Sequence, residues 1–140
     1  MKTFDVYLDS DVIISSCLSS TGAAYLLLEK DNLVKFYTDI QKYELKTVIN
    51  RLNIAPEILH QTLKKCTLIP LKSPNLDLFS KHTLDTHDRH IIAGAVASKA
   101  KFLISYNLKH FYIDTIKRDL NITILTPAQF LQFLRSLKQL

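Results

Sequence analysis

Short apolar runs alternate with amphipathic segments along the whole chain. The apolar runs are rich in β-branched and aromatic residues, which favour strands, and most segments between them carry apolar residues at helical spacing. Strands are predicted over residues 4–8, 33–37, 67–69, 102–104 and 122–125, and helices over residues 23–30, 40–52, 56–65, 89–100 and about 114–120, with further helices that start at residues 12 and 127. Strands that alternate with helices imply βαβ units and a mainly parallel sheet, so the predicted fold class is α/β. A length of 140 residues fits one domain, residues 1–140.

Polar side chains follow the predicted strands at the edge where such sheets bind ligands. In parallel α/β sheets, ligands lie outside the carboxyl ends of the strands. Asp9 ends the first strand, Asn107 lies just past the strand over residues 102–104, and Asp88 opens the most apolar helix. Taken singly, Asp9 is an ordinary turn residue and Asp88 an N-terminal helix cap. Taken together, they suggest a hard cation bound by oxygen ligands.

Glu44 adds a third carboxylate to this set. Its helix begins directly after the second strand, so Glu44 starts near the same edge, at the boundary of the stripe formed by Leu45 and Val48. The alternative interpretation is an exposed glutamate paired with Lys42 or Lys46. Crowded carboxylates repel one another, and Mg²⁺ or Mn²⁺ would relieve that repulsion. Such an ion polarises a phosphoryl oxygen and generates hydroxide from water, which suits phosphodiester hydrolysis.

The composition excludes several classes of protein. The 18 Lys and Arg residues outnumber the 13 Asp and Glu residues, and the net charge of +5 permits a polyanionic partner without requiring one. Gly22 and Gly94 are the only glycines, so glycine-rich phosphate-binding loops are excluded. Cys17 and Cys66 have apolar neighbours and are expected to be buried thiols in a reducing cytosol. Neither a signal peptide nor a membrane span is visible, so a cytoplasmic location without a membrane partner is expected.

Several segments carry the motifs of one known family in a single order. They are Val-Tyr-Leu-Asp-Ser-Asp-Val-Ile at residues 6–13, Glu-Leu at residues 44–45, Asp-Arg-His-Ile-Ile-Ala-Gly-Ala at residues 88–95, Leu-Ile-Ser-Tyr-Asn-Leu-Lys-His-Phe at residues 103–111, and Ile-Leu-Thr-Pro-Ala-Gln-Phe-Leu at residues 124–131. Together they resemble the PIN-domain ribonucleases, in particular the VapC-like toxins of bacterial and archaeal toxin–antitoxin pairs. The resemblance implies a three-layer α/β/α sandwich with its acids at one sheet edge. It also implies an endoribonuclease that uses Mg²⁺ or Mn²⁺ to hydrolyse RNA phosphodiester bonds.

The resemblance assigns roles to individual residues. The implied metal-binding and catalytic residues are Asp9, Glu44, Asp88 and Asn107. Asn107 stands at a variable fourth position, where an amide in place of a carboxylate would weaken a second metal ion and favours a single one. Ser10 and Ser105 stand where small hydroxyl residues hold the site by hydrogen bonds. Asp11 stands where asparagine is commoner, and its charge lies near the metal site.

The expected partners are RNA, a small antitoxin protein and a second copy of the chain. RNA contacts are expected from Lys42, Lys46, Arg89, Lys109 and Tyr106. Tyr37 and Phe111 are further aromatic candidates, although Phe111 is a better core residue. An antitoxin could insert an arginine between the paired carboxylates. The homodimer rests on the resemblance and on the apolar content of residues 23–28 and 56–65, which exceeds what one small domain readily buries.

A phosphatase of the haloacid-dehalogenase type is the first alternative. Asp9, Asp11 and Val12 match its D-x-D-x-[TV] signature, in which Asp9 would be the nucleophile and Asp11 the general acid. Its later metal-binding acids should follow a strand. Here the candidates Asp85 and Asp88 follow a polar loop and open a helix.

Two further alternatives concern the same region. Asp85, His87 and His90 have a spacing that permits a zinc site on one helix face, although no other ligand pair supports it. A PIN-like RNA-binding module without catalytic activity is the non-enzymatic alternative, and the intact carboxylates weigh against it. His90 and His110 are otherwise expected to face RNA or to lie on the surface.

Overall fold

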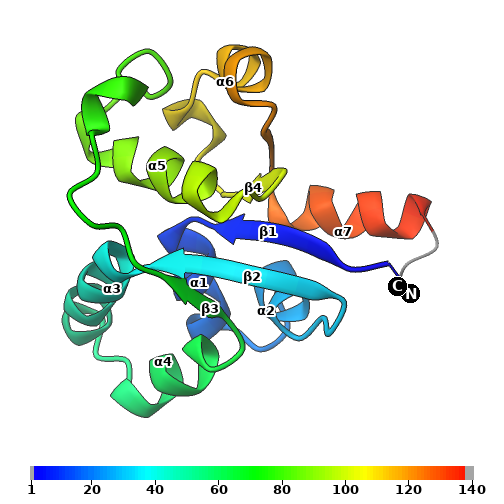
Figure 1. The fold of residues 1–140 in the computed structure, drawn as a ribbon. Coiled ribbons are helices and arrows are strands. Elements are labelled where there is room, and N and C mark those ends of the chain that lie inside the picture. The colour runs from blue at the N-terminus through cyan, green and yellow to red at the C-terminus, as the bar shows by residue number, and fades with distance from the viewer. Residues whose placement is uncertain (1, 138–140) are drawn as a thin grey trace.

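The computed structural model describes residues 2–137 (Figure 1). The strands are β1 (Phe4–Leu8), β2 (Leu33–Thr38), β3 (Thr67–Ile69), β4 (Phe102–Ile104) and β5 (Thr123–Leu125). The helices are α1 (Ser10–Leu18), α2 (Ala23–Leu28), α3 (Asp39–Arg51), α4 (Pro56–Leu63), α5 (Arg89–Ser98), α6 (Ile113–Leu120) and α7 (Pro127–Ser136). Short 3₁₀ turns are η1 (Leu76–Phe79), η2 (Thr86–Asp88) and η3 (Leu108–His110). The predicted alternation of strands and helices is confirmed.

The described strands form one parallel sheet in the order β3-β2-β1-β4-β5. The chain moves outward from β1 through β2 and β3, then crosses back and moves outward on the other side through β4 and β5. The order therefore reverses between β1 and β4, and loops that leave the strands in opposite directions open a crevice there. Asp9 directly follows β1 and Ser105 directly follows β4, so both residues stand at this crevice.

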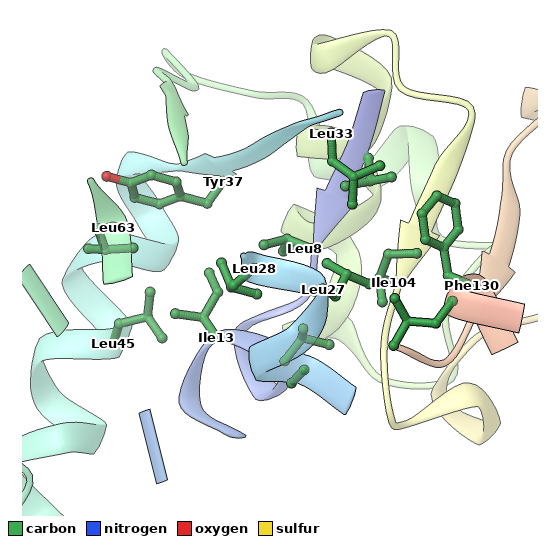
Figure 2. Packing of buried hydrophobic residues seen from close by; sticks show 14 of the residues in the cluster. Leu8, Ile13, Leu27, Leu28, Leu33, Tyr37, Leu45, Leu63, Ile104 and Phe130 are labelled. Atoms are coloured by element: carbon green, nitrogen blue, oxygen red, sulfur yellow. The ribbon is translucent and has the colours of Figure 1, made fainter. Parts of the chain in front are cut away.

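Helices cover both faces of the sheet, which gives three layers (Figure 1). Phe4, Val6 and Leu8 of β1 pack in a core cluster with side chains of α1, α2, α3, α4 and α7. Tyr7 points to the opposite face and packs with α5 and α6, as strand alternation requires. Figure 2 shows the first cluster around Leu8. The three-layer α/β/α arrangement implied by the resemblance is confirmed.

Gly94 lets α5 lie directly on the central strand. The helix is buried along most of its length, and a Cβ atom at Gly94 would fall 2.1 Å from the Tyr7 Oη atom. That atom cannot move away freely, because the Tyr7 hydroxyl donates a 2.5 Å hydrogen bond to the buried Gln41 Oε1. The close approach of α5 to β1 therefore depends on the missing side chain.

Gly94→Ala is expected to lower the free energy of unfolding by about 1–3 kcal/mol, the usual cost of overpacking a core. Gly22→Ala is the matched control, because a Cβ atom there meets only the Ser19 Oγ atom, at 3.7 Å. The control should cost less than about 1 kcal/mol, since it only weakens a helix N-cap. Urea unfolding of both variants measures the difference, and equal stabilities would contradict the packing argument.

Several predicted helices extend too far at their C-terminal ends. Helix α5 ends at Ser98 because Lys99 adopts a left-handed conformation, with φ 62°. Helix α3 ends at Arg51, and Asn53 is left-handed with φ 57°. Such residues commonly terminate helices, and apolar periodicity does not report them. Within residues 2–137, no helix combines the length and the apolar character needed to span a membrane.

Cys17 and Cys66 are both free and half-buried against the first core cluster. Burial raises the pKa of the Cys66 thiol to about 12, so it stays protonated and unreactive near neutral pH. The two cysteines thus behave as small apolar residues, in agreement with the sequence-based expectation.

Candidate functional site

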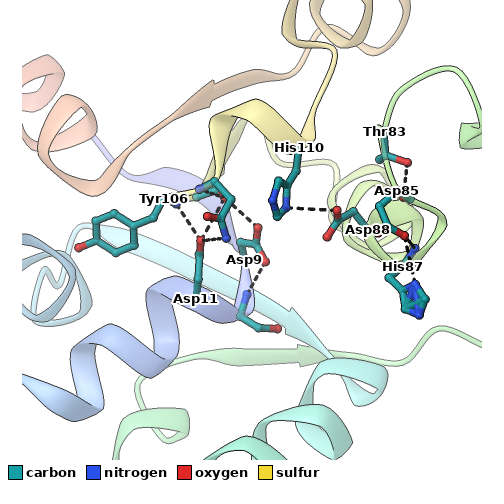
Figure 3. Close-up of polar contacts among 11 residues, drawn as sticks. Asp9, Asp11, Thr83, Asp85, His87, Asp88, Tyr106 and His110 are labelled. Carbon is teal, nitrogen blue, oxygen red and sulfur yellow. Dashed lines mark hydrogen bonds and ion pairs between the residues drawn. The ribbon is translucent and has the colours of Figure 1, made fainter.

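Asp9 is held at the crevice by two hydrogen bonds from opposite sides. It is buried, and its Oδ1 atom accepts a 2.7 Å hydrogen bond from the Ser10 backbone N–H at the start of α1. The Ser105 hydroxyl, directly after β4, donates a 2.8 Å hydrogen bond to Asp9 Oδ2. The two serines therefore contact this carboxylate differently, Ser10 through its backbone and Ser105 through its side chain. Figure 3 shows Asp9 beside Asp11 at this position.

Asp11 ties α1 to the segment that follows β4. Its Oδ2 atom accepts hydrogen bonds from the Tyr106 backbone N–H at 3.0 Å and from the Asn107 Nδ2 group at 2.9 Å. Its Oδ1 atom is buried and has no hydrogen-bond partner in the described structure. The Asn107 Nδ2 group thus binds Asp11, and of its side-chain polar atoms only Oδ1 is left for the role of fourth metal ligand.

A cleft of about 470 Å³ brings the predicted acids together. Asp9, Asp11, Glu44 and Asp88 all line it, from the end of β1, helix α1, helix α3 and the turn before α5. Apolar side chains, including Leu45 beside Glu44, form another part of its wall. The three carboxylates predicted to share one site therefore do share one cleft.

Histidines pair with two of these carboxylates. His90 Nε2 lies 3.1 Å from Glu44 Oε1, and His110 Nδ1 lies 3.3 Å from Asp88 Oδ2 (Figure 3 shows the second pair). The expectation that His90 lies at the surface is wrong, since this residue is only 9% exposed, although it does line the acidic cleft. Its apolar helix neighbours carry it into the interior, and the Glu44 carboxylate gives it a polar partner there. His110 is half-exposed at the other end of the cluster.

The pKa values of three aspartates in the cleft, Asp9, Asp11 and Asp88, are raised above the ordinary value. Burial raises the pKa of Asp9 to about 7, and the nearby charge of Asp11 adds to the shift. Burial also raises the pKa values of Asp11 and Asp88. Each shift means that a negative charge at this edge is costly without a counter-charge. A bound cation would supply that counter-charge.

The donor set suits a hard divalent cation. Asp9, Glu44 and Asp88 offer carboxylate oxygens, which such ions prefer, and the unpartnered Asp11 Oδ1 adds uncompensated negative charge beside them. Among residues 2–137, no three Asp, Glu, His or Cys side chains converge closely enough to form a metal-binding group. Glu44 and Asp88 each contact a histidine. The zinc alternative is not assembled among the described residues either: Asp85 and His87 lie together, but His90 contacts Glu44 instead of joining them.

The residues expected to contact RNA do not all lie beside the acids. Lys42 and Lys46 line a separate groove of about 1020 Å³ between α3 and α4, on the other side of the helix from Glu44. Arg89 Nη1 forms an ion pair with Asp77 Oδ1 at 3.3 Å, so the charge of Arg89 is already partly neutralised. Lys109 and Tyr106 are exposed, and the Tyr106 backbone touches Asp11.

Two aromatic residues belong to the core. Tyr37 is only 5% exposed and packs in the first core cluster, so base stacking by its ring is ruled out in this fold. Phe111 is buried in the second cluster, as expected. Tyr106, which is 43% exposed, remains the aromatic candidate at the site.

Gln41 is a buried positioning residue that the sequence-based reasoning missed. Its Oε1 atom accepts hydrogen bonds from the Thr38 N–H at 3.0 Å and the Tyr7 hydroxyl at 2.5 Å. Its Nε2 group donates to the Leu8 carbonyl at 2.7 Å and to Ser10 Oγ at 3.2 Å. Gln41 thereby fixes the start of α3, which carries Glu44, against the end of β1. The Thr-x-x-Gln spacing of a capping box was the available signal.

The fold is shared with a chain of a solved structure. The crystal structure of VapBC2 from Rickettsia felis bound to a DNA fragment from their promoter contains a chain that superposes with a TM-score of 0.61 at 15% sequence identity. The alignment covers 88% of this chain and 98% of that chain. No protein-family model and no curated protein matches the sequence. The likeness confirms the fold predicted from the resemblance to VapC-like PIN domains.

Proposed function

We propose that this protein is a metal-dependent endoribonuclease of the PIN-domain type and the toxin of a toxin–antitoxin pair. The observation that carries the proposal is the shared cleft of Asp9, Glu44 and Asp88 at the point where the strand order reverses. The fold shared with a chain of the VapBC2 structure supports the VapC-like assignment. The sequence motifs that resemble this family contain all three acids.

Asp9, Glu44 and Asp88 would hold Mg²⁺ or Mn²⁺. The ion supplies Lewis-acid chemistry, which polarises a phosphoryl oxygen and makes hydroxide available near neutral pH. Ser105 donates to one oxygen of Asp9 and keeps it directed at the crevice. The side-chain amide of Asn107 binds the Asp11 carboxylate, and through this contact Asn107 supports the arrangement. We therefore propose that Asn107 orders the segment after β4 in addition to its place near the metal.

The substrate is proposed to be RNA that enters from the exposed side of the acids. The net charge of +5 favours a polyanion. Lys109 and Tyr106 are exposed next to Asn107 and offer a cation and a stacking surface. Lys42 and Lys46 lie on the side of α3 that faces the other groove. They would therefore contact only RNA segments at a distance from the cleaved bond.

Protein partners belong to the same proposal. An antitoxin is expected to cover the acidic cleft, where an arginine would pair with Asp9 or Asp88. The groove between α3 and α4 has apolar walls and lysines, and none of its described lining residues is acidic. A homodimer remains part of the proposal, supported by exposed apolar side chains such as Leu26 and Ile58 on α2 and α4.

The position of the later acids weighs against the phosphatase alternative. In that class these acids should follow a strand, whereas Asp85 precedes the 3₁₀ turn η2 and Asp88 ends it. Asp11 Oδ2 accepts hydrogen bonds from Tyr106 and Asn107 and thereby orders the segment after β4. The placement of Asp85 and Asp88 favours the nuclease.

The full-length protein is expected to cut a labelled single-stranded RNA at internal positions with Mg²⁺ or Mn²⁺, and EDTA should stop the reaction. Asp9→Asn should slow cleavage about 100-fold or more, because several kcal/mol of charge stabilisation depends on this carboxylate. Asp5→Asn is the matched control, since Asp5 is an exposed aspartate on the same strand. Equal rates for Asp9→Asn and the wild type, or no cleavage with either ion, would contradict the proposal.

A further inference from the structure

We propose that His90 is the positioning residue for Glu44: its imidazole fixes one carboxylate oxygen and leaves the other for a divalent cation. The inference rests on the proposed function, because it gives Glu44 the role of metal ligand. It adds a residue that neither the motifs nor the fold likeness assigns.

The contact joins two helices on opposite faces of the sheet. His90 belongs to α5, whose side chains pack in the second core cluster, and Glu44 belongs to α3, which packs in the first. The 3.1 Å contact between Nε2 and Oε1 therefore connects the two helices across the edge of the sheet. This contact lies within ion-pair distance and places the imidazole directly against one oxygen of the carboxylate.

Glu44 needs such a partner to be ordered. Its side chain is 46% exposed, and a free glutamate of this kind samples many rotamers that point into water. The His90 side chain is fixed by its burial within α5. A ligand that is ordered before binding loses less conformational entropy when it binds. Hydrogen bonds to ligating side chains commonly contribute about 10–100-fold to metal affinity.

The stability of the fold does not explain the histidine. The Nδ1 atom of His90 is buried without a hydrogen-bond partner, which is a net cost to the folded state. The residues that follow it on α5, from Ile91 to Ala95, are all apolar or glycine and buried. An apolar side chain would suit the position at least as well, so the imidazole is best explained by its contact with Glu44.

His82 provides a matched control within the same chain. It is also buried, its Nε2 atom lies 3.0 Å from Asp119 Oδ2, and its Nδ1 atom also lacks a partner. Asp119 belongs to α6 and does not line the acidic cleft. The His82 pair also has hydrogen-bond geometry, so it is at least as well ordered as the His90 pair, while its carboxylate lies outside the proposed metal site.

The test compares Mn²⁺ binding by calorimetry for the wild type, His90→Leu, His90→Gln and His82→Leu, each with a urea unfolding curve. His90→Leu should weaken Mn²⁺ binding about 10–100-fold while the protein remains folded. His90→Gln should restore most of the affinity, because its side-chain NH₂ can donate to Glu44. His82→Leu should bind Mn²⁺ like the wild type, whatever it does to stability.

Three results would overturn the inference. Wild-type affinity in His90→Leu, in a protein that cuts RNA, removes the positioning role and leaves the nuclease intact. Tighter binding in His90→Leu would show that the histidine competes with the metal for Glu44. A wild type that neither binds Mn²⁺ nor cuts RNA overturns the proposed function, and the role of His90 with it.

Discussion

Glu44→Gln is expected to reduce metal-dependent RNA cleavage about 100-fold or more, with the fold intact. The substitution removes one negative charge from the proposed metal site, where each charge stabilises the cation and the reacting phosphate. Glutamine has almost the same size and helix propensity as glutamate. The half-exposed position tolerates the change.

The same variant separates the two enzymatic hypotheses. In the phosphatase hypothesis Glu44 is only a helix residue, so hydrolysis of a small phosphomonoester should be unaffected. Rates are measured with labelled RNA and with the phosphomonoester, for the wild type, Glu44→Gln and the control Glu57→Gln. Glu57 is an exposed glutamate in the first turn of α4, outside the acidic cleft. Full ribonuclease activity in Glu44→Gln would remove this residue from the site.

Without divalent cations, the stability of the protein is expected to fall as the pH rises from about 5 to 7. The pKa of Asp9 is raised from 3.8 to about 7 on folding, so in this window the folded state binds more protons than the unfolded state. The raised pKa values of Asp11 and Asp88 act in the same direction. Asp85 and Asp119, whose pKa values are lowered, are ionised in both states here and add no slope.

Asp9→Asn should flatten this pH dependence and stabilise the metal-free protein at pH 7. Millimolar Mg²⁺ or Mn²⁺ should stabilise the wild type at pH 7, by about 2.7 kcal/mol when the ion is at a hundredfold excess over its Kd, and should have much less effect on the variant. Urea unfolding with EDTA or with metal, at pH 5 and pH 7, measures both effects. Identical pH slopes for the wild type and Asp9→Asn would contradict the assignment of the buried charge.

The sequence predicted the strands, their parallel pairing and the placing of the acids along one cleft because these features depend on local signals. Short β-rich runs mark the strands, and Asp9 follows one of them directly. Residues after parallel strands meet at one edge whatever the details of packing. The capping role of Thr38 was predictable for the same reason, since it needs only the next few residues.

The missed features depend on partners far apart in the chain. His90 is buried with its apolar neighbours on α5, and its polar partner Glu44 lies 46 positions earlier in the chain. Gln41 reaches back to Tyr7, and Tyr37 lies within a core that several helices complete. Asn107 was assigned to the metal by position, whereas its amide binds Asp11. Hydrophobic periodicity reports which face of an element is buried, not which side chain it meets there.

The hydrogen bond from Ser105 to Asp9 has a consequence for protein synthesis. The two residues are 96 positions apart, and the strand that carries Ser105 to the crevice is one of the last to be made. A growing chain emerges from the ribosome with Asp9, Asp11 and Glu44 first, long before the residues that hold those acids in place. The contact between Ser105 and Asp9 can therefore form only after about three-quarters of the chain has been translated, and the proposed ribonuclease activity is expected to appear no earlier.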